Sequence, residues 1–274
     1  MRRLTALLVV LALVAGCGGS DRANDILSET AANLGKVRSG DLTLRLIVSP
    51  REGTRGRIGF ELRGPFALRP GRLPIAKVAY TQIAGAREAT ATFISTGTNA
   101  YAEVNGKAYE LPPESVEVVR QAAAGIGGSG GLGRFDIRSW VEDPVLMEGG
   151  SVGGAATDHV SADLDVVAAA NGLLSLLREL GRDAPTIDGA EADRLRDAVE
   201  SSSFDVWSGR DDRLLRRLLI KAALGFDVPE SLRRALGEVV GAKVEFELGV
   251  SRPNEPVTVR PPANPLPSSE LPGG

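Results

Sequence analysis

Apolar side chains at every second position are the feature that most constrains the fold of this chain. The pattern is clear in the segments 42–48, 58–62 and 243–250. Successive residues of a strand face opposite sides of a sheet, so this spacing predicts strands that bury one face. Further segments of the same kind bring the expected total to nine or ten strands: 76–84, 87–96, 98–104, 107–111, 157–166, 204–207 and 214–222.

One pair of strands can be assigned from its turn. Asn105-Gly106 lies between two short apolar segments. A two-residue type I′ turn needs positive φ at both central positions, and Asn-Gly meets that need best. The sequence therefore predicts that the segment 101–104 pairs with the segment 107–110.

Helical spacing occurs between the strand segments without a regular alternation of strand and helix. The helices are expected at 23–36, 114–124, 136–146, 167–180, 189–200 and 229–237. This order predicts an α+β fold rather than a doubly wound parallel sheet. We expect one domain over 23–252, an irregular connection at 64–75, and a glycine-rich loop at 125–133. The segment 253–274 holds seven prolines and is expected to be a disordered tail.

The N-terminus has the pattern of a secretion signal. Arg2 and Arg3 precede a run of about 11 apolar residues, which is shorter than the roughly 20 of a membrane-spanning helix. The run ends in Val14-Ala15-Gly16-Cys17, which resembles the lipobox of bacterial lipoproteins. That resemblance implies a signal peptide at 1–16, lipid attachment (palmitate or a similar acyl group) at Cys17, and a lipidated tether at 17–22. The alternative is an ordinary signal peptide with a chance cysteine.

Composition excludes several classes of function. Cys17 and His159 are the single residues of their kinds, so an internal disulfide, a cysteine metal cage and a histidine-rich metal site are excluded. A sequence pI near 5.5 argues against nucleic-acid binding. Ser129 lies in a G-x-S-x-G pattern, but within a glycine-rich loop rather than between a strand and a helix. We therefore expect no enzyme, no cofactor and no metal, with His159 in a structural role.

Four stretches resemble a known family. They are 101–107, 154–160 with its Gly-x-x-Thr-x-His pattern, 206–214 with an apolar-Trp pair before an acidic turn, and 246–261. Together they resemble the LppX/LprG-type lipoproteins of actinobacteria, which share the shape of the lipoprotein carriers LolA and LolB. The resemblance implies a curved antiparallel sheet, a half-barrel, with helices across the concave face. It also implies an apolar cavity that takes the acyl chains of lipids or lipoglycans.

Strand parity supplies the candidates for the wall of such a cavity. They are Leu44, Leu46, Ile58, Phe60, Leu62, Phe93, Tyr101, Leu218 and Phe246 on strands, and Leu173, Leu176 and Leu177 on the covering helix. The alternative is that they form an ordinary packed core.

The sequence thus predicts an envelope lipoprotein on the extracytoplasmic face of the cell membrane. It would bind acyl chains and carry lipid or lipoglycan across the envelope, with an envelope transporter as a possible partner. The alternative is a structural or accessory lipoprotein that assists a transporter or envelope assembly and binds no lipid. A third reading, an extracytoplasmic enzyme, lacks a credible catalytic set.

Overall fold

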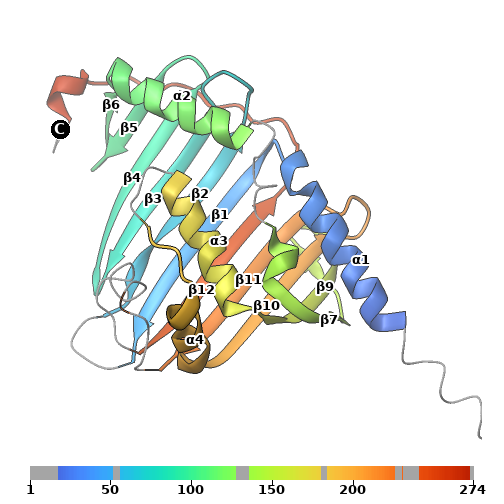
Figure 1. The fold of residues 1–274 in the computed structure, drawn as a ribbon. Coiled ribbons are helices and arrows are strands. Elements are labelled where there is room, and N and C mark those ends of the chain that lie inside the picture. The colour runs from blue at the N-terminus through green and yellow to red at the C-terminus, as the bar shows by residue number, and fades with distance from the viewer. Residues whose placement is uncertain are drawn as a thin grey trace, which may run out of the picture.

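A single antiparallel sheet dominates the computed structural model, which describes residues 18–51, 56–127, 136–179, 184–225, 230 and 241–271. The sheet has twelve strands in the order β6-β5-β4-β3-β2-β1-β12-β11-β10-β9-β7, and β8 pairs with β9 (Figure 1). The strands are β1 Ser39–Pro50, β2 Ile58–Ala67, β3 Ile75–Ala84, β4 Arg87–Thr96, β5 Ala100–Val104, β6 Lys107–Glu110, β7 Val141–Met147, β8 Ser151–Val152, β9 Ala155–Leu164, β10 Val199–Gly209, β11 Leu215–Leu224 and β12 Ala242–Ser251.

Four α-helices accompany the sheet in the described residues. They are α1 Gly18–Asn33, α2 Pro113–Gly127, α3 Val166–Glu179 and α4 Gly189–Ala198. All four lie on one side of the sheet, with α3 crossing its middle and α2 crossing one end (Figure 1). The expected fold class, α+β with a curved antiparallel sheet and helices on one face, is confirmed.

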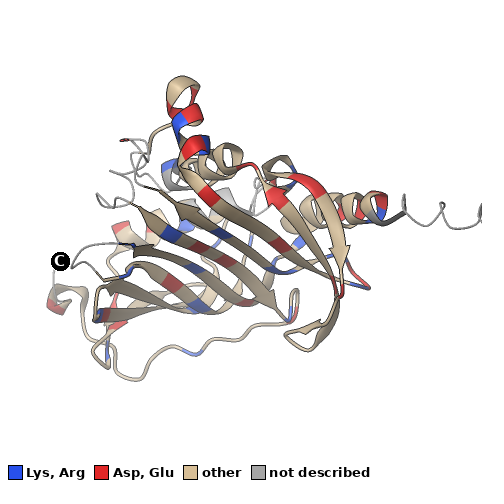
Figure 2. Ribbon diagram, turned by 90° about the horizontal axis from the view of Figure 1, so that it is seen from below, with Lys and Arg blue, Asp and Glu red and all other residues tan. Residues whose placement is uncertain are grey.

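The period-two pattern explains which face the helices cover. In β1, Leu42, Leu44 and Leu46 stand beside Val250, Leu248 and Phe246 of β12, and these apolar side chains share the helix-facing side. The intervening residues of the same strands are mostly polar or charged, so the opposite side of these two strands is polar. Figure 2 shows Lys, Arg, Asp and Glu recurring across neighbouring strands. We call the two sides the helix face and the polar face.

The turn predicted at Asn105-Gly106 is confirmed. Val104 pairs with Lys107 and Tyr101 pairs with Glu110. Asn105 has φ 52° and Gly106 has φ 75°, as a type I′ turn requires.

The segment 136–146, expected to be a helix, is mostly a strand. A short 3-10 helix, Ile137–Trp140, is capped by the Asp136 side chain, which accepts a hydrogen bond from the Ser139 amide. The chain then enters β7, which forms one edge of the sheet. Pro144 fits there because an edge strand tolerates a missing N–H donor, and a register shift falls between Glu142 and Val145. Asp136 and Pro144 together give this segment the sequence pattern of a short helix.

The expected irregular connection at 64–75 is also shorter than predicted. Strand β2 continues to Ala67, and Pro65 pairs with Asp41 of β1. The pairing with β3 skips from Arg63 to Phe66, where proline has no N–H to donate.

Both expected flexible ends require correction within the described residues. Residues 18–22, expected to be a tether, are the first turn of α1. The segment 253–271, expected to be disordered, runs along one end of the sheet toward β6. There the Leu266 amide donates a hydrogen bond to the Ala108 carbonyl of β6 at 2.8 Å. The predicted helix at 229–237, the loop residues 128–133, Cys17 and the signal segment lie outside the described residues, Glu230 excepted.

Candidate functional site

The helix face divides into a packed part and an open part. Under α1 and α3, Trp140 of the 3-10 helix and side chains from β9 to β12, among them Phe204 and Leu215, form one buried cluster. Leu218 is 1% exposed and Phe246 is 4% exposed within this cluster. These two sequence candidates are therefore packed core rather than the wall of a cavity.

Four further candidates lie at the margin of the packed part. Leu44, Leu46 and Leu173 are half-buried and pack against the large cluster. Ile58 is half-buried and packs against a small cluster of Val48 and Ala242. These side chains border the packed core on the side toward β2.

The open part of the helix face lies over β2, β3 and β4. Phe60 and Leu62 of β2 and Phe93 of β4 are half-buried. All three lie outside the buried clusters of the described residues. The register places Val78 beside Phe93 and Tyr80 beside Leu62, so the five side chains share one side of three adjacent strands. We call this group, Phe60, Leu62, Val78, Tyr80 and Phe93, the open apolar strip.

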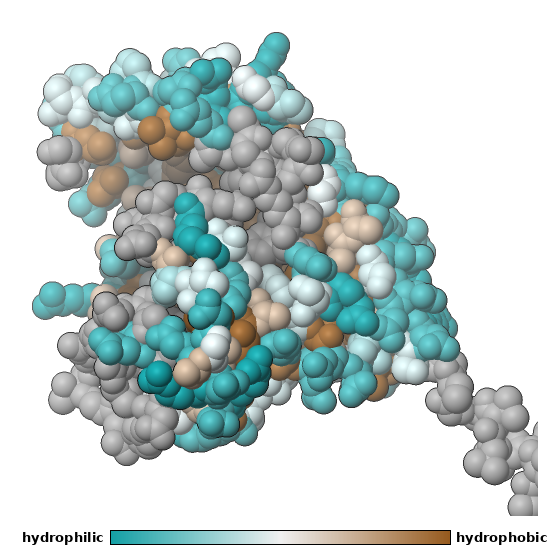
Figure 3. Space-filling model, viewed as in Figure 1, coloured by the Kyte–Doolittle hydropathy of each residue, from teal (hydrophilic) through white to brown (hydrophobic). Residues whose placement is uncertain are grey.

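Tyr80 is the most exposed side chain of the strip, and the other four are half-buried. Tyr80 is 42% exposed, and its ring stacks on Phe60 with 6.3 Å between ring centroids. On the neighbouring helix α2, Val118 is 65% exposed. Figure 3 shows hydrophobic surface below α2, toward the end of the sheet that carries β4 to β6. Within the described residues, these three strands therefore present a partly exposed apolar surface on the helix face.

Tyr101 does not belong to this surface. It pairs with Ile94 and Glu110, whereas Phe93 pairs with Ala102, so Tyr101 lies on the polar face. It is nevertheless buried, with 6% of its surface exposed. Parity alone fails here because the turn between β4 and β5, with Ser95 beside Ala100, sets the register. The side chains of Leu176 and Leu177 lie outside the described residues.

Two members of the strip were missed by the sequence reasoning. Val78 and Tyr80 alternate with Lys77 and Ala79 in the segment 76–84. This segment is predicted as a strand from the sequence, but none of the cavity candidates lies in it. The same alternation that identified Phe60 and Leu62 was present and would have identified them.

A partly buried polar cluster holds α1 to the sheet. Asp158 of β9 accepts hydrogen bonds from Arg213 Nη1 at 2.5 Å and from Arg210 Nε at 3.2 Å. Arg213 also lies 3.1 Å from Glu29 of α1. Beside this pair, the hydroxyls of Thr30 and Ser208 hydrogen-bond at 2.7 Å. We call these six residues the α1 clamp.

Electrostatics in the clamp region favour ionised carboxylates. Burial raises the pKa of Asp158, but the hydrogen bonds and charges of Arg213 and Arg210 outweigh burial and hold the pKa below its ordinary value. Burial likewise raises the pKa of nearby Asp212, and the Arg216 guanidinium at 2.6 Å outweighs it and lowers the pKa.

The polar face carries ordered ion pairs and one aromatic stack. His159 lies flat on Trp207, with 4.4 Å between ring centroids and 8° between ring planes. Its Nε2 lies 2.9 Å from Asp205, and Arg217 lies over the Trp207 ring while binding Glu247 at 2.7 Å. His159 thus makes structural contacts, as expected.

Neither a membrane-crossing helix nor a metal cluster occurs in the described ranges. No helix there combines the length and the apolar character of a membrane span. Nor do three or more His, Cys, Asp or Glu side chains gather there closely enough to hold a metal ion.

Known proteins resemble this chain in structure, at low sequence identity. No protein-family model matches this chain, and neither does any curated protein sequence. Among solved structures, LprF from Mycobacterium bovis is 16% identical, with a TM-score of 0.46 over 90% of this chain and 99% of its own. LppX from Mycobacterium tuberculosis is 12% identical, with a TM-score of 0.38 over 88% and 99%. A LolA superfamily protein from Nitrosomonas europaea is 9% identical, with a TM-score of 0.22 over 88% and 94%. LprF and LppX are members of the family that the sequence resembles.

Proposed function

We propose that this protein is an envelope lipoprotein that is anchored through an acylated Cys17 and binds lipid acyl chains against the open apolar strip. The observation that carries the proposal is the strip itself. Large apolar side chains on three adjacent strands remain half-exposed on the face that elsewhere is packed under helices.

The strip has the chemistry that hydrocarbon binding needs. Each CH₂ group moved from water into apolar surroundings contributes roughly 0.8 kcal/mol. About ten methylenes would therefore contribute roughly 8 kcal/mol before the cost of ordering the chain. Such binding needs no polar specificity, which agrees with a strip made of aliphatic and aromatic side chains.

The proposed anchor lies next to a rigidly held helix. Helix α1 begins at Gly18, directly after Cys17, and the α1 clamp ties its other end to the turn that joins β10 and β11. An acyl group on Cys17 would therefore hold the whole sheet close to the membrane surface. We propose that the bound lipid is exchanged with that membrane and carried into the envelope.

Acyl-chain binding can be tested with cis-parinaric acid, a fatty acid that fluoresces when bound. The mature chain from residue 17, carrying Cys17→Ser, should bind it saturably. Leu62→Ser together with Phe93→Ser should weaken binding at least about tenfold, which corresponds to about 1.4 kcal/mol. The matched control is Val145→Ser, which changes an apolar residue that is 48% exposed on the polar face.

The accessory-lipoprotein alternative is favoured by the packed cluster under α3, since that part of the interior is filled by side chains. It predicts that the wild-type chain does not bind the probe. Equal weakening by the strip variant and by the Val145 variant would also argue against the strip as the binding site.

A further inference from the structure

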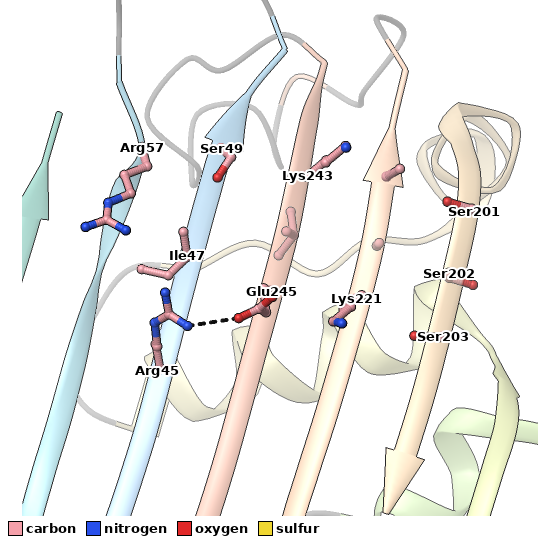
Figure 4. Close-up of a pocket in the computed structure, with 13 residues that line it drawn as sticks. Arg45, Ile47, Ser49, Arg57, Ser201, Ser202, Ser203, Lys221, Lys243 and Glu245 are labelled. Carbon is pink, nitrogen blue, oxygen red and sulfur yellow. Dashed lines mark hydrogen bonds and ion pairs between the residues drawn. The ribbon is translucent and has the colours of Figure 1, made fainter.

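A hollow that is unrelated to the open apolar strip lies on the polar face of the sheet. Its volume is about 520 Å³, and it crosses β10, β11, β12 and β1 toward the start of β2 (Figure 4). Four cationic side chains line it: Arg45, Arg57, Lys221 and Lys243. We call it the cationic hollow.

The hollow exists because its floor is made of small side chains. The cross-strand row Ser201, Ala223, Lys243 and Ser49 places three small residues beside one long one. In the next row, Ser203 stands beside Lys221. Long side chains at the rim and short ones between them leave a depression in an otherwise continuous sheet face.

The charges of the hollow are not balanced. Glu245 is the one acidic residue among those that line it, and it lies 3.0 Å from Arg45. Arg57 is paired with Glu88 at 2.9 Å. The ammonium groups of Lys221 and Lys243 form no ion pair or hydrogen bond with other described residues, and both side chains are exposed. This local excess of positive charge stands in a chain whose formal net charge is −3.

Hydroxyl groups complement the two lysines. Ser201, Ser203 and Ser49 line the same hollow, and Figure 4 shows Ser49 and Lys243 close together near one end of the strands. Ammonium groups bind phosphate as point charges, and serine hydroxyls donate hydrogen bonds to its oxygens. The hollow is larger than one phosphate group needs, so it can take a ligand with several oxyanions.

We propose that the cationic hollow binds a phosphate-bearing anion through Lys221 and Lys243, with the three serine hydroxyls as hydrogen-bond donors. The ligand is recognised by its phosphate groups, whether they belong to a soluble molecule or to a lipid headgroup. This site is separate from the apolar strip, because it lies on the opposite side of the sheet and does not depend on acyl-chain binding.

Inorganic pyrophosphate is the first probe, measured by titration calorimetry on the mature chain with Cys17→Ser at about 20 mM salt, where screening is weak. Wild type should bind it saturably, and Lys221→Gln with Lys243→Gln should weaken binding at least about tenfold. The matched control, Lys77→Gln with Lys107→Gln, removes the same charge from β3 and β6, outside the hollow. Thermal melting of each variant verifies its fold.

Vesicles of phosphatidylcholine with and without phosphatidic acid form the second arm, and distinguish a lipid headgroup from a free phosphate. Binding of pyrophosphate alone indicates a soluble phosphate ligand, and binding of phosphatidic acid vesicles alone indicates a lipid headgroup. Either result supports the site if the Lys221→Gln and Lys243→Gln variant loses that binding. The proposal is overturned if neither probe binds, or if the control variant loses binding as much as the variant in the hollow. Parinaric acid binding should be unchanged in the hollow variant.

Discussion

The carboxylate of Asp158 lies 2.5 Å from Nη1 of Arg213, and Asp158 is 6% exposed. Through Arg213, this pair also holds Glu29 of α1, the helix that follows the proposed lipid anchor. A pairing between residues 55 positions apart in the sequence therefore helps to hold α1 on the sheet.

Replacing Asp158 with Asn should destabilise the protein by about 1–3 kcal/mol, because Arg213 and Arg210 lose the charged acceptor that the buried Asp158 carboxylate supplies. Asp193→Asn is the matched control, since Asp193 pairs with Arg196 in an exposed position and such pairs contribute about 0–1 kcal/mol. Urea unfolding of the two variants gives the comparison. Equal losses would show that the clamp pair contributes no more than a surface pair.

Acid should weaken the protein through the same carboxylates. The pKa values of Asp158 and Asp212 are lowered in the folded state, so their contribution is complete above the ordinary Asp pKa of 3.8 and is lost as the pH falls through the folded values. The free energy of unfolding should therefore be nearly constant from about pH 7 to about pH 5 and should fall below about pH 4. Asp158→Asn should show a shallower fall, and an unchanged fall would count against this account.

Glycine is required at position 64 in the middle of β2. Its φ is +144°, and an added Cβ would lie 2.0 Å from the Lys77 carbonyl oxygen of β3. Gly64→Ala should therefore destabilise the sheet by about 3 kcal/mol or more, since the backbone strands would have to separate. Gly150→Ala, where no atom lies within 4 Å of the added Cβ, should have little effect on the thermal midpoint. Similar midpoints for both variants would contradict the close packing of β2 on β3.

Lipid anchoring predicts a clear change of cellular fraction. Cys17→Ser should move the full-length protein from the detergent phase to the aqueous phase in a Triton X-114 separation, because the acyl groups that hold it would be absent. Metabolic labelling with radioactive palmitate should mark the wild type and leave Cys17→Ser unlabelled. Unlabelled wild type would support an ordinary signal peptide.

Much of the sheet could be predicted from the sequence because strand burial leaves a period of two, as in β1 and β12. Strand β7 could not, since Asp136 and Pro144 give the local signals of a short helix, and only pairing with β9 makes the segment extended. The prolines between 253 and 271 gave the composition of a free tail, whereas the Leu266 pairing with β6 depends on tertiary contact.

The candidate site was only partly predictable for a related reason. Alternation shows that Phe60, Leu62, Leu218 and Phe246 share a face, but it does not show which part of that face the helices cover. Helix α3 packs over Leu218 and Phe246. It leaves Phe60 and Leu62 half-buried. The predicted face of Tyr101 was wrong because the turn between β4 and β5 sets the register of β5.

Native mass spectrometry of the mature chain with Cys17→Ser, purified from several bacterial hosts, tests the central claim most directly. Lipid binding against the open apolar strip predicts a population heavier than the bare chain by the mass of a lipid, and predicts its loss in the Leu62→Ser and Phe93→Ser variant but not in Val145→Ser. Bare chain alone from every host, with the fold intact, would contradict the claim.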